Sequence, residues 1–155
     1  MSNGAGRAIW YELALFVAGA FCLGNALWQG SLLNSDDVIY ADMARTAWRM
    51  GDFWDLRWHD AVLFEKPPLL FLILGGFGGL FGFDDFSMRL PGAMAGLMTL
   101  GVLWAIVRTM GGARKEARIS VLLILSSYTY IFHCRRVLAD PLFVFAMYAF
   151  LLFWI

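Results

Sequence analysis

Three groups of charged residues in this 155-residue chain have types and spacing that could carry out chemistry. They are an acidic pair (Asp36-Asp37), a lysine group (Glu65-Lys66, directly before Pro67-Pro68) and an arginine pair followed by an acid (Arg135-Arg136 and Asp140). A carboxylate can take a proton from an attacking hydroxyl or hold a cation. Ammonium and guanidinium groups bind phosphate. The functional interpretation is therefore a hydroxyl group activated by acid side chains and an anionic ligand held by basic ones.

Each group also has a structural interpretation, which the residues alone leave open. The acidic pair would complement the positive end of a helix dipole, an effect worth about 0.3–1 kcal/mol. The lysine group would be an ion pair at a membrane surface, with the lysine side chain reaching toward water. The arginine pair and Asp140-Pro141 would mark a simple break between two helices.

The composition predicts a membrane protein. Hydrophobic residues make up 61% of the chain, charged residues 15%, and the mean hydropathy is +0.67. A soluble domain is typically about half apolar and about a quarter charged. The same apolar content excludes a disordered chain. Twelve basic residues balance twelve acidic ones, which argues against a nucleic-acid partner.

The charge bias predicts how the chain crosses the membrane. Loop 108–118 has four basic residues and one acid, and the positive-inside rule places it in the cytoplasm. Stretch 34–87 has nine acids and four bases and is then external. The arginine pair is also external, against the usual bias, so an anionic ligand is one candidate for its compensation. The uncharged stretches predict four spans, at about 10–33, 88–108, 118–133 and 141–155, of which the last is incomplete because it is too short to cross a bilayer untilted.

The external stretch is expected to contain two helices at the membrane surface. Residues 36–50 form an amphipathic pattern, with Ser35 as a candidate cap and Gly51 as a stop. Residues 67–83 begin with two prolines and are rich in glycine. These features predict a short, half-buried helix packed on protein at the outer interface.

The order of these motifs resembles the polytopic GT-C-fold glycosyltransferases. The likeness is greatest to the group that contains the protein mannosyltransferases and the lipid A aminoarabinose transferases, which is glycosyltransferase family 39-like. It covers the chain from about residue 10. The residues that carry the resemblance are Asp36-Asp37-x-x-Tyr40, Glu65-Lys66-Pro67-Pro68-Leu69, Arg89-Leu90-Pro91 and Arg135-Arg136-x-x-x-Asp140-Pro141.

The resemblance implies an all-α, polytopic membrane fold and a GT-C-like N-terminal module. It also implies sugar transfer from a polyprenyl-phosphate-linked donor to a lipid, protein or glycan acceptor of the cell envelope. Transfer would invert the anomeric carbon and take place on the external face of the cytoplasmic (inner) membrane. Family members are several hundred residues long, so we expect this chain to be an N-terminal fragment that does not turn over alone.

The resemblance also implies roles for single residues. Asp36 matches the proposed base for the acceptor, and Asp37 stands where many members have glutamate. Lys66, beside Glu65, matches a lysine associated with the donor phosphate. No cofactor is implied with certainty, and a divalent metal at the acidic pair stays open. Tyr40 matches a position that supports the first external helix. Arg135 or Arg136, together with Asp140, matches the later external loop that lines the donor site.

Two other classes of protein compete with the glycosyltransferase interpretation. A transporter or flippase fragment for an anionic lipid would line its path with charges, and the apolar stretches carry none. A non-catalytic membrane scaffold would use the external charges only to shape the interface.

Overall fold

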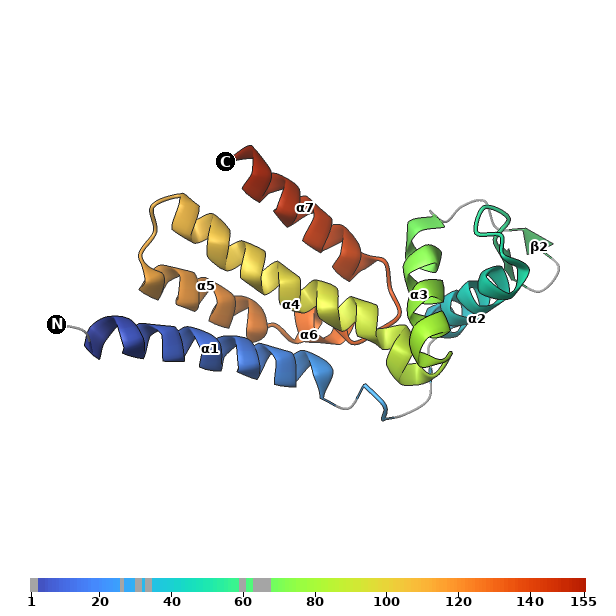
Figure 1. Cartoon of the computed structure of the whole chain (residues 1–155), viewed down its shortest axis with the longest axis horizontal. Coiled ribbons are helices and arrows are strands. Elements are labelled where there is room, and N and C mark those ends of the chain that lie inside the picture. The colour runs from blue at the N-terminus through green and yellow to red at the C-terminus, as the bar shows by residue number, and fades with distance from the viewer. Residues whose placement is uncertain (1–2, 26, 30–31, 33–34, 59–60, 63–67) are drawn as a thin grey trace.

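The computed structural model describes residues 3–155 except for 26, 30–31, 33–34, 59–60 and 63–67. The described part is helical apart from one antiparallel pair of two-residue strands. Helices α1, α4, α5 and α7 run along the long axis of the molecule, and α2, α3 and the strands lie together at one end (Figure 1). The elements are α1 (Asn3–Gly24), α2 (Ser35–Met50), β1 (Arg57–Trp58), β2 (Ala61–Val62), α3 (Pro68–Phe81), α4 (Asp85–Thr109), α5 (Arg114–Leu125), α6 (Tyr128–Cys134) and α7 (Asp140–Trp154).

Helix α2 occupies the stretch 36–50, for which the sequence predicts an amphipathic helix. Met43, Ala44 and Ala47 follow helical spacing and are almost fully buried. Gly51 comes directly after the helix and has a φ of +70°, a conformation that costs glycine little because it has no Cβ. The buried stripe fixes which face of α2 turns toward the protein and therefore which side chains of its first turn face inward.

Helix α3 packs closely against α2 because its glycines leave room for aromatic rings. A Cβ at Gly79 would overlap the indole ring of Trp48, and a Cβ at Gly75 would lie 2.8 Å from Phe53. Small residues at a helix interface allow this close approach. The glycine-rich composition of 67–83 is therefore explained by packing.

Helix α4 begins at a capping box formed by Asp84 and Ser87. The Asp84 carboxylate accepts a hydrogen bond from the Ser87 backbone N–H at 2.8 Å, and the Ser87 hydroxyl accepts one from the Asp84 backbone N–H at 3.2 Å. The box satisfies backbone donors that have no partner within the helix. The box fixes the residue at which α4 begins, and Arg89 lies in the second turn of this helix.

Two hydrophobic clusters hold the turn after α6, which carries Arg135 and Arg136. Cys134, just before the pair, is buried in a cluster formed by α1, α4 and α5. Val137, just after it, is buried in a second cluster with α2, α3 and the start of α4. Because it is anchored on both sides, this turn is a fixed part of the structure.

The first helix ends earlier than the sequence predicts. The predicted span reaches residue 33, whereas α1 ends at Gly24. Backbone carbonyls after this point bind arginine side chains of α4 and of the turn after α6 instead of continuing the helical ladder. Hydropathy does not distinguish an apolar, uncharged stretch that continues a helix from one whose backbone carbonyls bind distant side chains.

The predicted span at 118–133 is broken. Helices α5 and α6 meet at an angle of 72°. Ser126 donates a hydrogen bond to the Leu123 carbonyl at 2.7 Å, and the Ser127 hydroxyl accepts one from the Tyr130 backbone N–H at 3.4 Å. Serine hydroxyls compete with backbone partners in this way and favour helix ends over helix interiors.

The helices differ in how well they could cross a membrane. In the described part of the chain, α4 is long and apolar enough for a span, and the bent pair α5–α6 would be a second. Shorter apolar helices lie at Ala8–Gly24, Pro68–Phe81 and Asp140–Trp154. The basic loop between α4 and α5 lies at the end of the molecule opposite α2 and α3 (Figure 1). The charge bias predicts that these two regions lie on opposite sides of the membrane.

Candidate functional site: a cavity lined by arginines

A cavity of about 310 Å³ lies where the end of α6 and the turn after it meet the starts of α2 and α4. It is at the small end of the range for ligand sites, which is about 300–1,000 Å³. Three guanidinium groups and one carboxylate belong to its wall. The lining residues are Gln29, Asp37, Arg89, Tyr128, Ile131, Phe132, Arg135 and Arg136.

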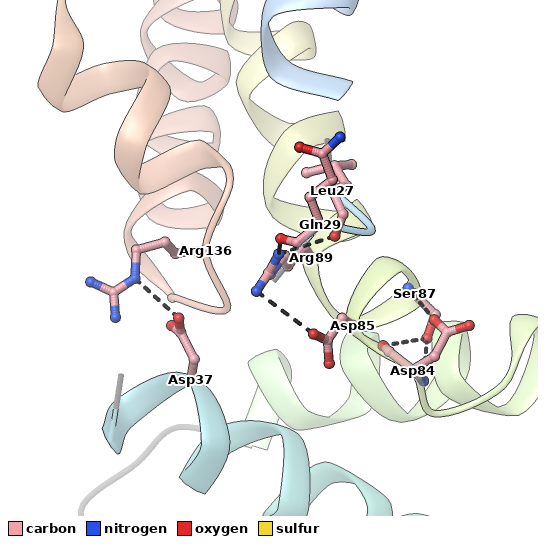
Figure 2. A network of polar contacts seen from close by, with 8 residues as sticks. All are labelled: Leu27, Gln29, Asp37, Asp84, Asp85, Ser87, Arg89 and Arg136. Carbon is pink, nitrogen blue, oxygen red and sulfur yellow. Dashed lines mark hydrogen bonds and ion pairs between the residues drawn. The ribbon is translucent and has the colours of Figure 1, made fainter. Parts of the chain in front are cut away.

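Arg136 and Asp37 form an ion pair between the turn after α6 and the first turn of α2. The Arg136 Nε lies 3.1 Å from Asp37 Oδ2, as Figure 2 shows. The side chains are only 17% and 6% exposed. The Arg136 guanidinium also lies 5.1 Å above the ring centre of Phe132, a cation–π contact. The pair joins two elements that are about a hundred residues apart in the chain.

Arg89 reaches the same cavity from α4. Its Nη1 donates hydrogen bonds of 3.1 Å to the backbone carbonyls of Leu27 and Gln29, and its Nη2 lies 3.9 Å from Asp85 (Figure 2). In the sequence, Arg89 belongs to the family motif Arg89-Leu90-Pro91 but is not among the predicted site residues. The signal that could have found it is the same one that marks the arginine pair: it is a cation on the predicted external side of a span.

Arg135 is held by main-chain atoms in the same way. Its Nη2 donates a 2.6 Å hydrogen bond to the carbonyl of Asn25, just beyond the end of α1. Adjacent residues of the arginine pair therefore have different partners, a carbonyl for Arg135 and a carboxylate for Arg136. Both side chains still line the cavity.

The cavity can bind an anion. Its wall carries three guanidinium groups against one carboxylate, a surplus of two positive charges in a chain whose formal net charge is zero. Guanidinium groups recognise phosphate and carboxylate through planar, directed hydrogen bonds. The Asp37 carboxylate is already paired with Arg136, and no cluster of three His, Cys, Asp or Glu side chains exists among the described residues.

The two acids of the acidic pair have different surroundings. Asp37 is buried and lines the cavity, whereas Asp36, one residue earlier in the first turn of α2, is exposed. Tyr40, one turn further on, packs edge-on against Phe71 of α3, with ring centres 5.9 Å apart. In the structure Tyr40 thus contributes to the contact between α2 and α3.

Asp140, another predicted site residue, does not line this cavity. Asp140 lines a second, largely apolar cavity of about 300 Å³ between α4, α6 and α7. It is an exposed residue at the start of α7. Glu65 and Lys66 lie outside the described residues.

Gly92 sets how closely the arginine turn approaches α4. A Cβ at this position would lie 3.0 Å from the backbone oxygens of both Cys134 and Arg136. We expect Gly92→Ala to push the turn outward and to lower the free energy of unfolding by about 1–3 kcal/mol. Gly101→Ala on the same helix is the control, because its Cβ would meet only Phe16, at 4.0 Å. Thermal unfolding in detergent should separate the two variants, and equal midpoints would contradict the role of Gly92.

Comparison with known proteins places this arrangement in a family. The chain resembles ArnT from Cupriavidus metallidurans, solved as a crystal structure with bound undecaprenyl phosphate: the TM-score is 0.80 and the identity 26%, over 91% of this chain and 26% of that one. An uncharacterized protein of Aquifex aeolicus (strain VF5) is 24% identical over 130 residues, which are 84% of this chain and 25% of that protein. The chain therefore spans about a quarter of the length of each relative.

The resemblance to the GT-C glycosyltransferases and the predicted all-α, polytopic membrane fold are confirmed by this likeness. Residues 65–155, more than half of the chain, match the model of a family described as dolichyl-phosphate-mannose-protein mannosyltransferase. The match contains α3 to α7 and the arginine pair, but it begins after the acidic pair. The chain belongs to the dolichyl-phosphate-mannose-protein mannosyltransferase family.

Proposed function

We propose that the arginine-lined cavity holds the phosphate of a polyprenyl-phosphate-linked sugar. The chain would then be part of a glycosyltransferase that moves this sugar to a lipid, protein or glycan acceptor of the cell envelope. The reaction would take place on the external face of the cytoplasmic membrane. The observation that carries the proposal is the surplus of positive charge in one small cavity on the side of the molecule that holds α2 and α3.

The proposed chemistry needs a base and a stabilised leaving group. The acceptor hydroxyl attacks the anomeric carbon on the face opposite the phosphate, the bond from that carbon to the phosphate oxygen breaks, and the configuration inverts. The leaving lipid phosphate gains negative charge, which Arg89, Arg135 and Lys66 would stabilise. Asp36 would take the proton of the acceptor hydroxyl, because it is exposed and no ion pair of the described chain engages it.

Binding of a sugar-free lipid tests the proposal directly. The full-length natural protein in lipid nanodiscs should bind undecaprenyl phosphate. Arg135→Gln should weaken this binding by about 10- to 100-fold, because it removes a charged hydrogen-bond donor from the cavity. The dissociation constant can be measured by titration with lipid carrying a fluorescent label.

Arg45→Gln is the matched control for this titration. Arg45 is an exposed arginine of α2 that lies over the Phe83 ring, 5.8 Å from its centre, and belongs to the wall of a different cavity. Its loss should leave lipid binding unchanged. Wild-type affinity in Arg135→Gln, or equal losses in both variants, would contradict the assignment of the phosphate to the arginine-lined cavity. A non-catalytic scaffold would show no specific lipid binding in any variant.

A further inference from the structure

The Asp37–Arg136 ion pair is only half formed. A carboxylate and a guanidinium normally make two parallel hydrogen bonds when the fork of the arginine faces both carboxylate oxygens. Here Nε of Arg136 binds Oδ2 of Asp37 at 3.1 Å. The atoms of the second bond, Nη2 and Oδ1, are both buried and have no hydrogen-bond partner in the described part of the chain.

Leaving both atoms unpaired is costly, because each lies out of contact with water and belongs to a charged group. The Asp37 side chain is 6% exposed, so water outside the protein cannot satisfy it. Both residues line the arginine-lined cavity. The pair therefore borders the cavity, and a small turn of either side chain would present its open atoms to a group that enters.

The chemistry of the two open atoms selects the entering group. Nη2 is a donor and needs an acceptor, whereas Oδ1 is an acceptor and needs a donor. A phosphate oxygen would satisfy Nη2 but would repel Oδ1, since both are negatively charged. A hydrocarbon chain would satisfy neither atom. A hydroxyl group satisfies both, as the water molecule that it would displace does, because it accepts one hydrogen bond and donates another.

We infer that the Asp37–Arg136 pair binds one hydroxyl of the donor sugar, on the carbon next to the anomeric carbon. This inference rests on the proposed function, in which Arg89 and Arg135 hold the phosphate in the same cavity. The anomeric carbon carries the phosphate, so the hydroxyl on its neighbour is the closest to those arginines. In a cavity of about 310 Å³ the sugar ring cannot lie far from the phosphate. Asp37 is then a specificity-determining residue for the sugar, and the two acids of the acidic pair have different tasks.

The experiment compares lipids with and without the sugar. The full-length natural protein in nanodiscs is titrated with undecaprenyl phosphate and with undecaprenyl phosphate carrying mannose, glucose or aminoarabinose. The sugar-bearing lipid that binds most tightly is then compared with its 2-deoxy form. Wild-type protein should bind the sugar-bearing lipid about 10-fold or more tightly than the sugar-free lipid.

Asp37→Asn is the test variant. Its amide oxygen can stay on Arg136, and its NH₂ group then replaces the acceptor that the hydroxyl needs. The variant also removes the carboxylate that lines the described wall of the cavity, so undecaprenyl phosphate should bind at least as tightly as in the wild type. The gain of about 10-fold that the sugar provides should be lost. The ratio of the affinities for the 2-deoxy lipid and the sugar-free lipid should be the same in the variant and in the wild type. Retained sugar-free binding also shows that the variant is folded.

Asp42→Asn is the matched control, because Asp42 is an exposed acid of the same helix outside this cavity. It should retain the preference for the sugar. Three results would overturn the inference: no preference for any sugar in the wild type, equal weakening of both lipids by Asp37→Asn, or the full effect of that variant on the 2-deoxy lipid. Absence of undecaprenyl phosphate binding in the wild type would instead contradict the proposed function, on which the inference rests.

Discussion

Arg136→Ala should lower the free energy of unfolding by about 3–5 kcal/mol, because it leaves the buried Asp37 carboxylate without its charge partner. The variant also removes the link between α2 and the turn after α6 and the cation–π contact with Phe132. Thermal unfolding of the detergent-solubilised, full-length natural protein, followed by tryptophan fluorescence, should show a clearly lower midpoint.

The double variant Asp37→Leu with Arg136→Met distinguishes two causes of lost stability in Arg136→Ala. One is the buried carboxylate left without a charge partner, and the other is the loss of side-chain packing. Replacing both members of a buried pair by apolar residues removes the uncompensated charge and is often neutral for stability. The double variant should therefore unfold at a higher temperature than Arg136→Ala, although it should lose ligand binding. A midpoint for Arg136→Ala equal to that of the wild type would mean that the pair is solvated and does not join the two elements.

Asp36→Asn should reduce sugar transfer by about 100- to 10,000-fold, the usual contribution of a general base. The substitution keeps the size of the side chain and removes its ability to take a proton. Binding of undecaprenyl phosphate should not change, because Asp36 does not belong to the wall of the arginine-lined cavity. Transfer from a radiolabelled sugar-lipid donor in nanodiscs measures the rate, and titration measures the affinity.

The control for Asp36→Asn is again Asp42→Asn, which removes the same charge from an exposed position further along α2. It should keep the wild-type rate. If both variants keep the wild-type rate, Asp36 has no catalytic role. It then only complements the positive end of the helix dipole, which is the structural interpretation of the acidic pair. If both variants lose the wild-type rate equally, the effect comes from the surface charge of α2.

The helices that follow a strong pattern could be predicted from the sequence. The apolar stripe with Met43 and Ala47 places α2 within one residue of its predicted start, and α4 covers all of 88–108. The end of α1 could not be predicted, because it depends on arginines more than sixty residues away that bind carbonyls after Gly24. The break between α5 and α6 was missed as well, since two serines do not interrupt a hydropathy pattern.

The candidate site was predictable as a set of residue types but not as an arrangement. The sequence indicates that Arg135 and Arg136 need compensation, but only the fold shows that Arg136 pairs with Asp37. The sequence also groups Asp140 with the arginine pair, whereas in the structure Asp140 belongs to the wall of another cavity. These relations depend on the directions in which neighbouring side chains leave a turn. Linear spacing does not encode those directions.

The way in which Arg89 and Arg135 are held has a consequence for how this region can diverge between relatives. In the described residues, both arginines donate hydrogen bonds to backbone carbonyls of the segment after α1, a partner that every amino acid provides. Exposed positions such as Asn25 and Gln29 can therefore exchange their side chains while the main chain keeps both arginines in place. Natural variation in this wall of the cavity could alter what the site accepts without a loss of its positive charge.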